Sequence, residues 1–462
     1  MEKAEKGIIF FYGLPAYGHT LSNLYLAGRL AGTGFRVVYY SAEPFRETIE
    51  ENDCEYRAYP MDWETLDLTD GERILKLYRL VLEYTWKMLP KLLEQAEEER
   101  PCVVIFDSLA LWGRAVGQLR AVPSFAFYSI AAIDWTWGFP RARGGAGAAV
   151  DSVGLSAGFR KCAYEERRDG IAADVSDGSA RFRKHCREER DACRYPISPW
   201  GKGLGAYAPG FSAGFLRYAG EIPGAAGYAK RLKVRYGLRN LGLLPVLMNR
   251  GDYNLCGYSR LFQPGGQGFG REYRFVGPLS VHRKITEQND FSCWDEDLSM
   301  PLIYISLGTV FNQNEEFLQT VVEQLGQRTA NRPEDGSFRV VLVWSGAKSR
   351  VFPENFTVRP FVNQNEILKH ASLFLTAGGM NSIHEALYFG VPCLMCPQQG
   401  EQRLNAQRFE RLGFGRILRD PQRLRREAWE CMKLKERWDE KLRKRMTGVR
   451  VGKVLELFEA FD

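Results

Sequence analysis

Two separate stretches of the sequence alternate short apolar runs with amphipathic helical runs, and this rhythm constrains the fold more than any other feature. In the first stretch, strand-length apolar runs near residues 7–14, 35–41, 102–107 and 123–129 are separated by helical runs, including a long one near residues 72–98. Strands that are apolar throughout are typical of a parallel sheet covered by helices on both faces. The pattern therefore predicts an α/β fold with a doubly wound sheet.

The same alternation restarts at residue 301 and continues through apolar runs at 338–346, 356–362, 372–377 and 391–397. A chain of 462 residues also exceeds the size at which one hydrophobic core stops growing, so two Rossmann-like domains are expected. Apolar runs at 244–249 and 273–278 are expected to supply the last strands of the first domain. The predicted segments are an N-terminal domain (1–280) with an irregular insertion near 141–227, a linker (281–300), a C-terminal domain (301–445) and a C-terminal helix returning to the first domain (446–462).

Composition and charge narrow the class of protein. The chain carries 63 basic and 56 acidic residues, a surplus too small to indicate a nucleic-acid partner. Its ten cysteines are irregularly spaced and do not resemble a disulfide framework. The first apolar run is too short for an export signal or a membrane span. We therefore expect a cytoplasmic protein without membrane association, for which a monomer would suffice.

Two turns in the second domain follow predicted strands and offer backbone N–H groups to an anion. One runs from residue 306 to 309, and the other is a Gly-Gly turn that leads directly into a helix at 380. Free N–H groups at such a position stabilise phosphate oxygens, and together the turns suggest a bound diphosphate. Ordinary strand-to-helix turns remain the alternative. The candidate residues are Ser306, Thr309, Gly378, Gly379, Asn381 and Ser382.

A histidine and an aspartate follow two strands of the first domain. His19 comes just after the first strand, and Asp107 ends a later parallel strand, so both lie on the same edge of one sheet. A histidine paired with a carboxylate can act as a general base. The predicted helix N-terminus at His19 is expected to disfavour the imidazolium and keep the ring neutral. A polar surface histidine and a helix-capping aspartate are the alternatives.

Several motifs, taken in order, resemble one family of enzymes. They are "FYGLPAYGHTLSN", "IFDSLALWGRAVG", "FVGP", "YISLGT", "FVNQNEIL" and "LTAGGMNSIHEALYFGVPCLMCPQQGEQRLNAQR". Together they are similar to the macrolide-type branch of the UDP-dependent glycosyltransferases of family 1. The resemblance implies the GT-B fold, in which two Rossmann-like domains face each other across a cleft.

The resemblance also implies an activity, namely inverting transfer of a hexose, with glucose favoured, from a UDP-sugar to a hydroxyl of a small lipophilic acceptor. No cofactor or metal beyond the UDP-sugar is expected. His19 matches the family's base and Asp107 the carboxylate behind it. The charge on the departing UDP would be met by the two turns described above.

Other site residues are implied by the same resemblance. Phe361 matches the aromatic residue that stacks on uracil, and Gln364 belongs to the base and ribose site. Glu385 matches the carboxylate that binds the ribose hydroxyls. Glu401 and Gln402 match the acidic-Gln pair that holds the hydroxyls of the sugar.

One departure from the family pattern concerns the diphosphate. The family has a histidine directly before its Gly-Gly turn, whereas this chain has Ala377. Losing one hydrogen bond to a charged group would cost about 1.5 to 3 kcal/mol of UDP binding. The departure leaves open a UDP-sugar-binding accessory or regulatory protein with little activity.

The aromatic run at 127–139 and the long helix near residues 72–98 are expected to line the acceptor pocket, although these segments equally suit an ordinary core.

Overall fold

The computed structural model describes most of the two predicted domains. The described residues are 6–61, 63, 74–132, 220–282, 300–308, 315–326, 338–344, 351–398 and 400–461. They belong to one compact unit, which comprises Met1–Ile133 and Gly214–Asp462. Most of the predicted insertion, most of the predicted linker and Thr309 lie outside the described residues.

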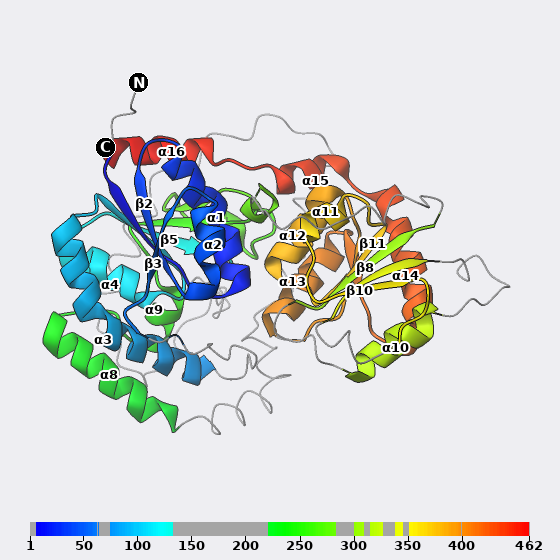
Figure 1. Cartoon of the computed structure of the whole chain (residues 1–462), viewed down its shortest axis with the longest axis horizontal. Coiled ribbons are helices and arrows are strands. Elements are labelled where there is room, and N and C mark those ends of the chain that lie inside the picture. The colour runs from blue at the N-terminus through cyan, green and yellow to red at the C-terminus, as the bar shows by residue number, and fades with distance from the viewer. Residues whose placement is uncertain are drawn as a thin grey trace, which may run out of the picture. The chain divides into compact units, whose positions relative to one another are not determined.

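The first sheet has seven parallel strands in the order β3-β2-β1-β4-β5-β6-β7 (Figure 1). Its strands are β1 (Ile8–Tyr12), β2 (Arg36–Ser41), β3 (Glu55–Ala58), β4 (Val103–Asp107), β5 (Ser124–Tyr128), β6 (Tyr253–Cys256) and β7 (Tyr273–Phe275). Its helices are α1 (Tyr17–Ala31), α2 (Arg46–Glu50), α3 (Ile74–Glu99), α4 (Leu111–Arg120), α8 (Glu221–Tyr236) and α9 (Leu243–Met248).

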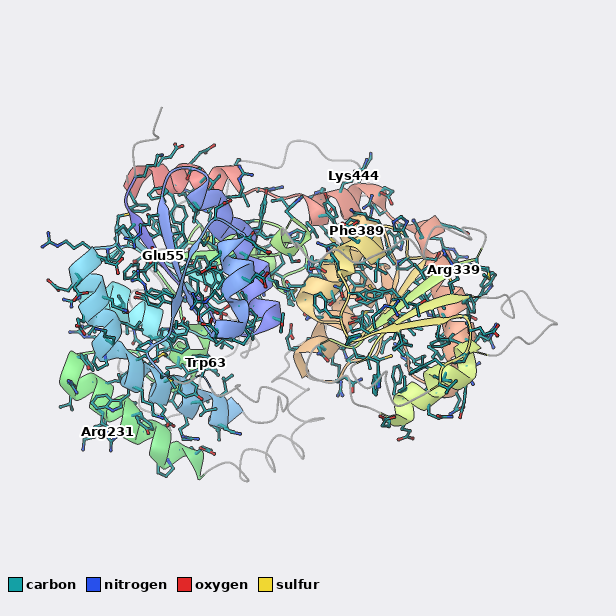
Figure 2. The ribbon with its side chains drawn as sticks, in the orientation of Figure 1. Glu55, Trp63, Arg231, Arg339, Phe389 and Lys444 are labelled. Atoms are coloured by element: carbon teal, nitrogen blue, oxygen red, sulfur yellow. The ribbon has the colours of Figure 1, made fainter. Side chains whose placement is uncertain are left out.

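The strands of this sheet are buried on both faces, as the apolar pattern predicts. In β1, Phe10 and Tyr12 belong to one hydrophobic cluster and Ile9 and Phe11 to another, because successive side chains of a strand point to opposite faces. Side chains drawn on the ribbon fill the space on either side of the sheet (Figure 2).

One predicted strand is wrong. Residues 244–249 form most of helix α9 rather than a strand, and the strand that follows β5 in the sheet is β6, which the sequence analysis missed. A six-residue apolar run does not distinguish a helix from a strand by its period. Pro245 resolves the ambiguity, since proline is tolerated in the first turn of a helix but removes a hydrogen bond from a central strand.

The second sheet has six parallel strands in the order β10-β9-β8-β11-β12-β13. Its strands are β8 (Leu302–Ser306), β9 (Arg339–Val343), β10 (Phe356–Arg359), β11 (Leu373–Thr376), β12 (Cys393–Met395) and β13 (Gly415–Ile417). The later helices are α10 (Glu315–Gly326), α11 (Gln364–Leu368), α12 (Met380–Phe389), α13 (Gly400–Arg411), α14 (Leu424–Met432), α15 (Glu440–Thr447) and α16 (Gly452–Phe458). Short 3₁₀ helices are η1 (Glu43–Phe45), η3 (Gly266–Gly268), η4 (Leu279–His282), η7 (Pro421–Arg423), η8 (Lys433–Arg437) and η9 (Glu459–Phe461).

The two sheets confirm the predicted fold class, two doubly wound Rossmann-like sheets. The last helix contacts the first sheet, since the ring of Phe458 in α16 stacks on Phe125 of β5 with centroids 4.4 Å apart. None of the helices in the described ranges is both long and apolar enough to span a lipid bilayer.

Each sheet has one point where the strand order reverses, and ligands of doubly wound sheets bind outside the carboxyl ends of the strands at this point. In the first sheet it lies between β1 and β4, and in the second between β8 and β11. Since His19 follows β1 and Asp107 ends β4, the predicted base is at the first switch point. Ser306 ends β8, and the Gly-Gly turn follows β11, so the predicted diphosphate turns are at the second.

Candidate active site

The predicted base and its carboxylate are hydrogen-bonded to each other. His19 Nδ1 lies 2.8 Å from Asp107 Oδ2. The Asp107 side chain is fully buried, and its other oxygen accepts the backbone N–H of Leu109 at 2.9 Å. With Nδ1 facing the carboxylate, Nε2 is the nitrogen that can receive a proton, and 13% of the His19 side chain is exposed. The pair therefore has the geometry of an oriented general base.

The direction of the pKa shift expected for His19 from its helix N-terminus is wrong. Burial disfavours the imidazolium and lowers its pKa, but the charge and hydrogen bond of Asp107 and the charge of Glu401 raise it. The net result is a pKa above the ordinary 6.5. The two carboxylates therefore outweigh the effect of burial.

A residue that the sequence analysis missed also lies beside the base. Ser129 directly follows β5, the neighbour of β4, and its Oγ lies 2.9 Å from His19 Nδ1. The rule that placed His19 and Asp107 on one sheet edge would have found it, because the carboxyl end of β5 meets the same edge.

The two turns of the second sheet lie side by side. Ser306 is the register partner of Thr376, the last residue of β11. Gly378 follows with φ of +85°, a left-handed conformation that favours glycine, and Gly379 caps the N-terminus of α12. Ala377 is 3% exposed and packs into this turn. The two predicted turns thus meet at one edge of the second sheet, and Thr309 lies outside the described residues.

The predicted base and ribose residues form a connected group. The amide of Gln364 donates to Glu385 Oε2 at 2.6 Å and lies 3.5 Å from Ser382 Oγ. Gln364 Oε1 accepts the Tyr304 hydroxyl at 3.2 Å, a contact that the sequence analysis did not predict. Phe361, the predicted uracil-stacking residue, is 45% exposed, which leaves its ring available to a ligand.

The predicted sugar-binding residues begin helix α13, against the Gly378 turn. The amide of Asn405 donates to Glu401 Oε1 at 2.6 Å and to the Gly378 carbonyl at 3.3 Å. Gln402 Oε1 accepts the backbone N–H of Gln398 at 2.8 Å. Asn405 was missed, although its position four residues after Glu401 on one helix was a usable signal.

Two observations link the donor residues to the base. The Asn381 amide donates to the carbonyl of Gly18, next to His19, at 2.6 Å. Asn381 therefore contacts the first turn of α1, the helix that carries the base, in addition to any role at a diphosphate. Burial raises the pKa of the Glu401 carboxyl, while the Asn405 hydrogen bond and the charge of His19 lower it. Glu401 and His19 are thus close enough to influence each other's charge.

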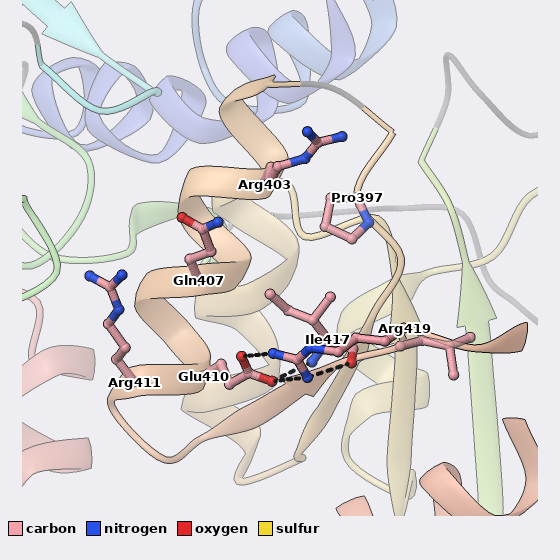
Figure 3. Close-up of a pocket in the computed structure, with 8 residues that line it drawn as sticks. Pro397, Arg403, Gln407, Glu410, Arg411, Ile417 and Arg419 are labelled. Carbon is pink, nitrogen blue, oxygen red and sulfur yellow. Dashed lines mark hydrogen bonds and ion pairs between the residues drawn. The ribbon is translucent and has the colours of Figure 1, made fainter. Parts of the chain in front are cut away.

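A pocket of about 520 Å³ lies elsewhere, on another face of α13 (Figure 3). It contains none of the predicted site residues, and at its base Glu410 pairs with Arg419. Its lining residues are Pro397, Arg403, Gln407, Glu410, Arg411, Ile417, Leu418 and Arg419. Within the described ranges, no group of three or more His, Cys, Asp or Glu side chains is arranged to hold a metal ion.

Comparison with known proteins identifies the family. The profile of the UDP-glucoronosyl and UDP-glucosyl transferase family matches residues 275–419, which include the turn, Gln364, Glu385 and Glu401. Residues 275–419 therefore carry a domain of the UDP-dependent glycosyltransferases. The chain is 26% identical over 420 residues to the uncharacterized UDP-glucosyltransferase YojK of Bacillus subtilis strain 168, covering 89% of this chain and 85% of that protein.

Two further similarities extend over the whole chain. The NDP-glycosyltransferase YjiC of Bacillus licheniformis is 25% identical, with 89% of this chain and 84% of that protein covered. The crystal structure of the glycotransferase of kitacinnamycin matches with a TM-score of 0.68 at 20% identity, over 99% of each chain. Together these findings identify the chain as a glycosyltransferase enzyme with the GT-B fold that uses a nucleotide sugar.

Proposed function

We propose that this glycosyltransferase transfers a hexose, glucose in the first place, from a UDP-sugar to a hydroxyl of a small lipophilic acceptor, with inversion at the anomeric carbon and without a metal. The observation that carries the proposal is the His19–Asp107 hydrogen bond of 2.8 Å together with the electrostatic link between His19 and Glu401. This link joins the proposed base to the residue proposed to hold the sugar.

In the proposed reaction, His19 Nε2 removes the proton of the acceptor hydroxyl as its oxygen attacks C1 of the sugar. The new C1–O bond forms on the face opposite UDP, and the old C1–O bond breaks with its electron pair passing to the β-phosphate. The imidazolium donates its Nδ1–H to Asp107, which stabilises the positive charge as it forms. Inversion follows from this single displacement.

The negative charge on UDP requires stabilisation without a metal in this proposal. The N-terminus of α12, which follows the left-handed turn at Gly378, presents backbone N–H groups at the switch point of the second sheet, next to Ser306. A helix N-terminus and a hydroxyl stabilise a developing phosphate charge. Addition of EDTA is therefore expected to leave the rate unchanged.

Glucose and a lipophilic acceptor are proposed on separate grounds. Glucose is favoured by the acidic-Gln pair Glu401 and Gln402 and by the relatives described as UDP-glucosyltransferases. The acceptor class is favoured by an aromatic group near the base, in which Trp63 stacks on Tyr59 with centroids 5.4 Å apart. The Tyr59 hydroxyl donates to Gly13 just after β1, so these rings lie at the same sheet edge as His19. The predicted aromatic wall beyond Ile133 lies outside the described residues.

Incubation with UDP-glucose and a panel of phenols, macrolides and sterols tests the function. We expect UDP release that depends on the acceptor, a product heavier by one hexose in mass spectrometry, and a β-linked sugar by NMR. The comparisons give no support to the alternative of a UDP-sugar-binding accessory protein. UDP-glucose binding without UDP release from any acceptor would nevertheless favour that alternative.

Replacing Glu401 with glutamine is expected to move the low-pH limb of the kcat/KM profile to lower pH. The base must be neutral to act, so activity falls as pH drops through the pKa of His19, and Glu401 is one of the groups that raise this pKa. Gln402→Ala is the matched control, since it alters the same sugar site without removing a charge. If the low-pH limb of the kcat/KM profile lay at the same pH in Glu401→Gln as in the wild type, the electrostatic link between Glu401 and His19 would be contradicted.

Replacing Ala377 with histidine is expected to tighten UDP binding about ten- to hundredfold, because it adds one hydrogen bond to a charged group. Calorimetric titration with UDP measures the change. Since Ala377 is almost fully buried, Ala377→Leu controls for added bulk and is expected to bring no gain. An unchanged Kd for Ala377→His would mean that this position does not face the diphosphate.

A further inference from the structure

Ser129 occupies a position that neither the chain's motifs nor its family resemblance singled out. The strands β4 and β5 pair in parallel with Asp107 opposite Phe127, and the backbone N–H of Ser108 continues the ladder to the Phe127 carbonyl at 2.8 Å. Ser129, which is 4% exposed, is therefore held just beyond the carboxyl end of β5, at the switch point that holds the base. A rigid sheet edge fixes its place.

The Ser129 hydroxyl and the Asp107 carboxylate both approach the same nitrogen of His19. Ser129 Oγ is 2.9 Å and Asp107 Oδ2 is 2.8 Å from Nδ1. That nitrogen carries one proton at most, and the ionised carboxylate holds it there as a donor. Ser129 Oγ thus lies beside the Nδ1–H group that Asp107 accepts. The lone pairs of this hydroxyl oxygen stabilise the protonated form of the His19 ring.

We propose that Ser129 is a positioning residue for the base, which fixes the rotation of the His19 ring and shares its Nδ1–H with Asp107 so that Nε2 faces the acceptor hydroxyl. The inference rests on the proposed role of His19. Two contacts at one nitrogen restrict rotation of the ring about its Cβ–Cγ bond more than one contact does, because a turned ring would lose both. Ser129 itself touches no reacting atom in this arrangement.

Among the described residues, charged and titratable groups on three other elements bear on the His19 ring or lie near it. Asp107 on β4 and Glu401 on α13 raise the pKa of His19. Tyr39 on β2 turns its hydroxyl to Asn23 Oδ1 at 2.5 Å. A change at Ser129 that moves the pH profile would therefore act on a ring whose pKa these two carboxylates already raise.

Ser129→Ala is expected to lower kcat about three- to tenfold, the effect of one lost hydrogen bond, with an unchanged KM for the UDP-sugar. It is also expected to move the low-pH limb of the kcat/KM profile to lower pH, because an acceptor of the protonated ring has been removed. Ser129→Thr keeps a hydroxyl and is expected to restore most of the rate and the position of the limb. A role in folding alone would not move the limb.

Ser108→Ala is the matched control. Ser108 is buried next to Asp107, and within the described residues its hydroxyl has no hydrogen-bond partner, so its loss is expected to leave both kcat and the limb unchanged. Wild-type kcat and an unmoved limb in Ser129→Ala would overturn the proposal. A loss of activity in His19→Ala without any effect of Ser129→Ala would also overturn it, while leaving the proposed role of His19 intact. A fully active His19→Ala would instead refute His19 as the base.

Discussion

Replacing His19 with alanine is expected to lower kcat about 10²- to 10⁴-fold, because it removes the group that takes the acceptor proton. The Kd for UDP is expected to stay the same, since the residues proposed to hold UDP belong to the second sheet and none depends on the imidazole for its hydrogen bonds. Measuring kcat with a saturating acceptor, alongside calorimetric titration with UDP, separates the two effects.

His370→Ala is a suitable control for this result. His370 lies exposed after α11, away from both switch points, so its removal is expected to change neither value. Full turnover in His19→Ala would exclude His19 as the base. A loss of UDP binding together with turnover would instead indicate that the variant had disturbed the fold.

Replacing Asp107 with asparagine is expected to lower kcat by a comparable factor, although the change preserves the shape of the side chain. An amide placed 2.8 Å from Nδ1 turns an N–H toward that nitrogen, which favours the tautomer that carries its proton on Nε2. A protonated Nε2 cannot accept the proton of the acceptor. The loss should therefore persist at high pH, which a kcat series across pH can test.

The double variant gives the sharper comparison. If Asp107 acts only through His19, then Asp107→Asn combined with His19→Ala should be no slower than His19→Ala alone. Multiplying losses would show that Asp107 has a separate task, such as holding the loop through its bond to the N–H of Leu109. Full recovery of Asp107→Asn at high pH would contradict the tautomer argument.

Much of the fold followed from the sequence because the apolar strands are buried on both faces and so appear as continuous apolar runs. Residues 244–249 are one exception, since they form most of helix α9 although a short apolar run has no decisive period, and only Pro245 indicates the helix. The strand β6 was missed because "YNLC" lacks a continuous apolar run. The sequence pattern predicts the shortest helices and strands least well, because few residues carry the signal.

The candidate site, like the fold, was predictable from the sequence only in part. The sequence by itself determined that His19 and Asp107 share one sheet edge, although 88 positions separate them, because parallel strands bring their carboxyl ends together. It determined likewise that Ser306 and the Gly-Gly turn each follow a strand of the second sheet, whereas the left-handed conformation of Gly378 is known only from the structure.

Only the tertiary structure decided how these residues influence one another. Burial lowers the pKa of His19, whereas Asp107 and, to a smaller extent, Glu401 raise it. Glu401 belongs to a helix of the other sheet, and the N-terminus of the helix that carries His19 does not by itself predict this balance. The bond from Asn381 to Gly18 and the contact from Ser129 to His19 are likewise between distant segments. Hydrogen bonds and charge effects decay within a few ångströms, so they depend on the final separation of side chains, which periodicity and spacing along the chain do not specify.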